Sequence, residues 1–165
     1  MAERAESSAN DLLQQFHETS TEFIEFVETI PESRWNRVVP GFEWPVNVAA
    51  HHIADSWGTA IRSIQSIANG EPLPPMSREI IDHMNAEHAE RFANVSKEET
   101  LEALRDGAEA AEKVISSLSD EQLARESNPL RALGGRGATA RQFIETLLIA
   151  HPRQHLPAIR EAVES

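Results

Sequence analysis

The amino-acid sequence predicts an all-α protein in which four long helices pack together as a four-helix bundle. In four stretches of the chain, apolar residues recur at the three- and four-residue spacing of a buried helix face. Capping residues and prolines mark where these stretches begin and end, and no stretch shows the alternating pattern of a β-strand. A bundle buries four such stripes at once. The chain has 165 residues, which is the size of one domain, so we expect a single domain over residues 1–165.

The composition is acidic and lacks cysteine. The formal net charge is −12 and there are no cysteines, which excludes disulfides, thiolate metal sites and a cysteine nucleophile. A negative surface disfavours nucleic acid and anionic membranes as partners. No apolar run approaches the roughly 20 residues of a membrane span, and the polar N-terminus does not resemble a signal peptide. We therefore expect a cytoplasmic protein with no nucleic-acid and no membrane partner.

The first helix is predicted over residues 8–30, with Ser7 or Ser8 as its N-cap and a proline directly after its end. A connection rich in proline and tryptophan leads to the second helix, predicted over residues 45–69 with a glycine after its end. Both stretches carry a clear apolar stripe.

Two adjacent histidines, His51 and His52, lie near the start of the second helix. They fall on opposite sides of its apolar stripe, so periodicity alone does not decide between them. Either one could face a neighbouring helix, and we expect the other to meet solvent.

The third helix follows a proline-rich crossover and begins at Ser77. A capping box that opens with Ser96 predicts a kink or break after Val95, where the helix restarts. Its histidines, His83 and His88, are five residues apart and so do not form a same-face pair. We expect both of them at the surface.

The last helix is predicted over residues 139–164, and His151 and His155 lie four residues apart inside its apolar stripe. An unpaired buried polar group costs about 1–3 kcal/mol, so these imidazoles need a partner. That partner is either a metal ion or a hydrogen-bond network with neighbouring helices. Pro152 and Pro157 each remove a backbone donor and predict a kink near the histidines.

In a helical bundle, metal sites are built from side chains on facing helices. One histidine of the second helix and the pair in the last helix would supply three neutral imidazoles. Such a donor set suits Zn²⁺, Ni²⁺ or Fe²⁺. Three protein ligands leave a fourth position open for water or a substrate thiolate, as in catalytic zinc sites.

Two segments carry a family resemblance. The run F-E-W-P-V-N-V-A-A-H-H-I-A-D (residues 42–55) and the run A-H-P-R-Q-H-L-P-A-I (residues 150–159) resemble the DinB-like superfamily of four-helix-bundle proteins. This superfamily includes YfiT-type metal hydrolases, bacillithiol and mycothiol S-transferases, and the N-terminal domain of mycothiol-dependent maleylpyruvate isomerase. The resemblance covers nearly the whole chain and implies a DinB/YfiT-like bundle.

The resemblance also implies a ligand set. In the family pattern, a histidine followed by Leu or Ile near the start of helix two is combined with H-x-x-x-H in the last helix. This pattern selects His52, which precedes an isoleucine, over His51. It implies that His52, His151 and His155 bind the metal.

The family resemblance implies a thiol-dependent S-transferase or a metal-dependent hydrolase that acts on a small electrophile. A low-molecular-weight thiol would be a second small-molecule partner. The run D-H-M-N-A-E (residues 82–87) also resembles the third helix of the isomerase-like branch, where an acidic residue and an asparagine recur. Asn85 and Glu87 in this run, and Asp55 at the end of the run over residues 42–55, are weaker candidates for acid–base work or for support of the ligands.

The alternative function is non-catalytic. The chain would then be a helical bundle that binds a metal or a small ligand, or a stress-associated dimer. Bundles of this kind often pair through their helices, so a homodimer is the expected assembly in either case.

Overall fold

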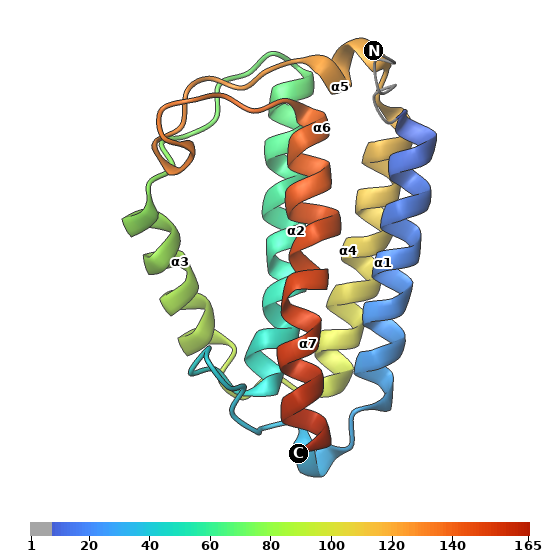
Figure 1. Ribbon diagram of the computed structural model, residues 1–165, viewed down its shortest axis with the longest axis vertical. Coiled ribbons are helices and arrows are strands. Elements are labelled where there is room, and N and C mark those ends of the chain that lie inside the picture. Colours follow the sequence, from blue (N-terminus) through green and yellow to red (C-terminus); the bar gives the residue numbers. More distant parts are fainter. Residues whose placement is uncertain (1–7) are drawn as a thin grey trace, which may run out of the picture.

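The computed structural model describes residues 8–165, and nearly all of its regular structure is helical. Four long helical segments run side by side (Figure 1): α1 (Ala9–Thr29), α2 (Val46–Ala68), α4 (Lys97–Ser117), and the unbroken run of α6 (Ala140–Phe143), η3 (Ile144–Ala150) and α7 (His151–Glu164). Shorter elements lie in the connections, namely η1 (Glu32–Arg34), α3 (Arg78–Arg91), α5 (Asp120–Ala124) and η2 (Arg131–Leu133). Within residues 8–165, β structure is limited to isolated bridges. The predicted all-α four-helix bundle is confirmed.

The four long segments form a ring around one core. α1 packs on α4, α4 on α2, and α2 on the η3–α7 run, which closes the ring against α1. Each segment contributes fully buried side chains to the centre, among them Phe16, Trp57, Leu104 and Ile144. The rings of Phe16 and Trp57 meet edge to face, with 5.3 Å between their centroids. No helix within residues 8–165 combines the length and the apolar character needed to cross a bilayer.

Side-chain caps set the helix starts where the sequence predicts them. Ser8, Ser96 and Thr139 each accept a hydrogen bond from the backbone three residues on, and each closes a capping box. Such a cap stabilises a helix by about 1 kcal/mol. Ser7, the other candidate cap of the first helix, lies outside the described residues.

The predicted third helix is two separate elements, and α3 is not part of the bundle. α3 ends at Arg91, and a short turn follows before α4 begins. In Figure 1 it stands apart from α2, and its contact with the bundle is slight. Ile80 and Met84 on α3 are exposed, because its few apolar residues do not form one long stripe. α4 does carry such a stripe and takes the third place in the bundle.

The last helix widens into a π-helix just before the histidine pair. The His151 N–H donates to the carbonyl of Thr146, five residues back. Pro152 has no N–H for the carbonyl of Leu148, and its ring would clash there in an α-helix. The wider turn accommodates the proline without ending the helix, so the disturbance predicted at this position takes the form of a π-helix.

Candidate metal centre

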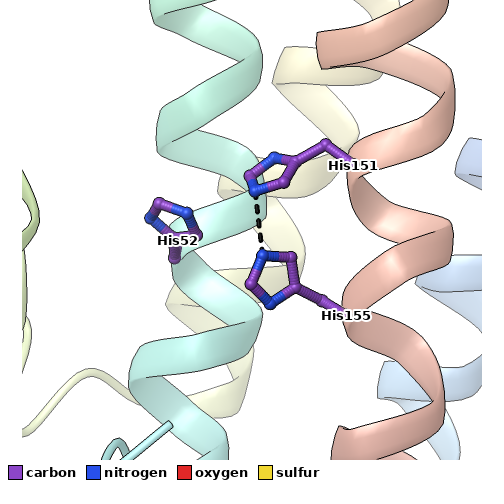
Figure 2. Close-up of side chains that lie close together, drawn as sticks. All are labelled: His52, His151 and His155. Carbon is purple, nitrogen blue, oxygen red and sulfur yellow. Dashed lines mark hydrogen bonds between the residues drawn. The ribbon is translucent and has the colours of Figure 1, made fainter. Parts of the chain in front are cut away.

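His52 of α2 faces His151 and His155 of α7 across the space between the two helices (Figure 2). One ring nitrogen from each histidine lies within 4.8 Å of the other two. The His52 ring centroid is 5.2 Å from that of His151 and 5.6 Å from that of His155. All three side chains are half-buried. The structure therefore brings together the three histidines that the sequence singled out.

His151 and His155 lie at the edge of the buried stripe, whereas the sequence placed them inside it. The buried positions of α7 include Pro152, Leu156 and Ile159, and the two half-buried histidines flank them on the side facing α2. One extra residue in a helix shifts all later positions by about 100° around the axis. The π-helix supplies such a shift, so an ideal helical wheel drawn from residue 139 misplaces this pair.

A serine that sequence reasoning missed fixes the tautomer of His151. The Ser56 hydroxyl lies 3.1 Å from Nδ1 of His151 and donates its own hydrogen to the carbonyl of Ile53 at 2.9 Å. We therefore assign the proton to Nδ1 of His151, which donates to Ser56 Oγ. Nε2 of His151 then has a lone pair directed at Nε2 of His155, from which it accepts a hydrogen bond when no metal is bound. Ser56 lies one helical turn after His52, where a group that orients a facing ligand is expected.

Burial keeps the three imidazoles neutral. Burial and, to a smaller extent, the neighbouring imidazoles of His151 and His155 together lower the pKa of His52 to about 3. Burial also lowers the pKa of His151 to about 4, with a smaller contribution from His155, and it lowers the pKa of His155. A histidine must be unprotonated to bind a metal. At neutral pH all three therefore offer a lone pair.

The spacing of the nitrogens fits one divalent ion. The Nε2 atoms of His151 and His155 are 2.9 Å apart. Two imidazole nitrogens on a tetrahedral ion, each about 2.05 Å from it, are about 3.3 Å apart. With the third nitrogen at most 4.8 Å away, small side-chain rotations bring all three to that separation. The residues present thus suit the Zn²⁺, Ni²⁺ or Fe²⁺ expected from their chemistry.

Two aromatic side chains from the loop before α2 pack on the cluster. The Phe42 ring lies 4.9 Å from that of His155, and the Trp44 ring lies 5.1 Å from that of His52. Between them, Glu43 adopts a φ of 59°, which is uncommon for a residue other than glycine. Strained backbone of this kind concentrates at functional sites. Here it allows two successive aromatic rings to reach two different histidines.

A second histidine pair lies beside the first. Nδ1 of His51 is 2.9 Å from Nε2 of His88, both residues are buried, and Phe92 stacks on His51 at 3.9 Å. The prediction that His88 lies at the surface is wrong, as is the expectation that one of His51 and His52 meets solvent. His88 was missed because its partner comes from another helix, so spacing along α3 gives no signal.

A cavity of about 360 Å³ opens next to His52 and His151, between α2, α3 and the α6–η3 segment. Asp55 and Asn85 line it. Glu87 does not line it: its Oε1 lies 3.3 Å from Nε2 of His83, and both side chains are exposed to solvent. Two of the three weaker candidates therefore border the space in which a ligand would meet the histidines.

Comparison with known proteins places this architecture in a family. The sequence model of the DinB superfamily matches residues 15–159. The fold resembles that of YfiT from Bacillus subtilis, described as a probable metal-dependent hydrolase with an unusual four-helix bundle topology. The TM-score is 0.78 at 16% identity, over 98% of this chain and 89% of YfiT.

Two further solved structures share the fold. One is the mycothiol-dependent maleylpyruvate isomerase, with a TM-score of 0.73 and 13% identity, over 96% of this chain and 63% of the isomerase. The other is DfsB, a sibling lethal factor precursor, with a TM-score of 0.70 and 18% identity over 94% of each chain. No curated protein matches by sequence. At these identities the likeness establishes the fold and leaves the activity to be argued from the site.

Proposed function

The chain belongs to the DinB superfamily, and on that premise we propose that it is a metal-dependent hydrolase of a small electrophilic substrate. His52, His151 and His155 would hold one divalent ion. The observation that carries this proposal is the convergence of three neutral imidazoles at the end of a cavity. An open position beside three protein ligands is typical of catalytic rather than structural sites. The description of YfiT as a probable metal-dependent hydrolase supports the same reading.

The ion, when bound, would act as a Lewis acid and lower the pKa of a nucleophile in its open position. The chain's own residues would supply orientation. Ser56 holds His151 in the ligand tautomer, and Phe42 and Trp44 restrict the rings of the other two histidines. Asp55, one turn after His52 and lining the cavity, is the proposed acceptor of the nucleophile's proton. Asn85 on the opposite wall would hydrogen-bond the substrate.

Thiol transfer is the second candidate. It is favoured by the structural likeness to an isomerase that depends on mycothiol. Because this chain has no cysteine, the thiol would come from a low-molecular-weight partner. The same site would then lower the pKa of that thiol instead of that of water.

The test is metal loading followed by activity. We expect one Co²⁺ per chain, lost in His52→Ala, His151→Ala and His155→Ala, and retained in the matched control His83→Ala, whose side chain is 73% exposed. Hydrolysis of a panel of small esters and amides should require the ion. A thiol-to-cobalt charge-transfer band, together with turnover only when thiol is present, would support the second candidate. A chain that binds no ion would leave only the non-catalytic bundle.

A further inference from the structure

The cavity beside the histidines has one apolar wall and one hydroxyl-bearing wall. The mainly apolar wall comes from the crossover before α3, from α3 itself, from the loop before α6, and from α6–η3. Its side chains include Leu73, Met76, Met84, Leu130, Phe143 and Leu147, and the polar Asn85, Gln142 and Thr146 lie among them. The facing wall is α2, which contributes Thr59 and Ser63. Pockets of this make-up bind mainly hydrophobic ligands and orient them through a few polar groups.

Charge inside the cavity restricts what can bind. Among the described residues that line it, Asp55 is the one carboxylate. Within residues 8–165, no lysine or arginine contributes to the lining. When no metal is bound, a carboxylate or phosphate would lose its water without gaining a cationic partner, and it would also face the carboxylate of Asp55. A divalent ion on the histidines would in turn repel a cationic ligand.

The cavity is elongated and ends at the histidines. Along α2 its lining runs from His52 to Ser63, a rise of about 16 Å at 1.5 Å per residue. Its volume of about 360 Å³ has room for about a dozen non-hydrogen atoms if each takes about 30 Å³, the share of a water molecule in the liquid. A ligand that fills it would place one end against His52 and His151 and the rest along the apolar wall.

We propose that this cavity binds an uncharged, elongated hydrophobic molecule whose polar group lies at the histidine end, and that in the metal-free protein it rejects anionic molecules of the same length. The inference deepens the proposed function, because it names the class of electrophile that the metal site would act on. It depends on the cavity's own walls, however, and it can be tested without a metal.

The test compares decan-1-ol with decanoate on chelator-treated, metal-free protein by isothermal titration calorimetry at neutral pH. The two molecules have the same chain length and differ in charge. We expect one decan-1-ol per chain and at least tenfold weaker binding of decanoate. Ser63→Phe, which places a ring in the cavity, should weaken decan-1-ol binding at least tenfold. Gln65→Phe, at an exposed position of the same helix, should leave it unchanged.

If Ser63→Phe fails to fold, Thr59→Phe on the same wall replaces it in this comparison. Equal or tighter binding of decanoate, or unchanged decan-1-ol binding in a folded cavity-filled variant, would overturn the proposal. Neither result would affect the metal site. Conversely, a chain that binds decan-1-ol and no Co²⁺ would refute the proposed function and leave the hydrophobic cavity standing.

Discussion

Replacing Ser56 with alanine should weaken metal binding about tenfold. The Ser56 hydroxyl is 3.1 Å from Nδ1 of His151 in a partly buried position. Its removal leaves that N–H without its acceptor and frees the ring to adopt the other tautomer, in which Nε2 carries the proton and cannot bind an ion. A hydrogen bond contributes about 0.5–1.5 kcal/mol, and loss of a group that orients a ligand typically costs 10–100-fold in metal affinity. The two ranges overlap near tenfold, about 1.4 kcal/mol.

The assay is competition for Zn²⁺ or Co²⁺ against a chromophoric chelator, with wild-type protein, Ser56→Ala and Ser63→Ala side by side. Ser63→Ala is the matched control, because it removes a hydroxyl from the same helix and the same cavity without touching a histidine. We expect a tenfold weaker affinity in Ser56→Ala and no change in the control. Equal affinity of Ser56→Ala and wild type, or an equal loss in both variants, would refute the role assigned to Ser56.

Three other predictions concern stability. The pKa values of about 3 for His52 and about 4 for His151 lie below the ordinary value of 6.5, which applies in the unfolded chain. As the pH falls below 6.5, these histidines take up protons only in the unfolded chain. The free energy of unfolding is therefore largest above pH 6.5 and decreases as the pH falls. Going from pH 7.5 to 5.0 without metal should cost about 2 kcal/mol for each histidine, and a His151→Gln variant should show a smaller drop in Tm. Gly137→Ala should destabilise by about 1–3 kcal/mol, since its Cβ would lie 2.5 Å from the carbonyl oxygen of Ser127; a denaturation midpoint equal to that of wild type would contradict this. Gly107→Ala in α4, where the nearest atom would be an ordinary 3.4 Å away, should instead stabilise by up to about 1 kcal/mol in the same denaturation experiment.

Local rules account for what the sequence could predict of the fold. Capping boxes depend on residues three apart, so Ser8, Ser96 and Thr139 mark helix starts without knowledge of the rest of the chain. Apolar stripes identify the helices that need partners, which predicts the bundle. The same rules could not show that α3 stands outside it, because that outcome depends on how α4 competes for the same place.

The histidines also divide into those that a sequence pattern could identify and those whose position depends on tertiary packing. Position on the helical wheel left His51 and His52 undecided, and the family pattern chose His52, which the structure places beside His151. The burial of His88 depends on where α3 lies over α2, a tertiary property with no local signal. The π-helix ahead of Pro152 could be foreseen only as a disturbance, since several backbone adjustments relieve the same clash.

The most direct test of the central claim is anomalous diffraction from crystals of the Zn²⁺-loaded protein, recorded on both sides of the zinc absorption edge. We predict one strong peak per chain, about 2.0–2.1 Å from one nitrogen of each of His52, His151 and His155. A peak elsewhere on the chain, or no peak between these helices at full loading, would contradict a metal centre built from the two facing helices.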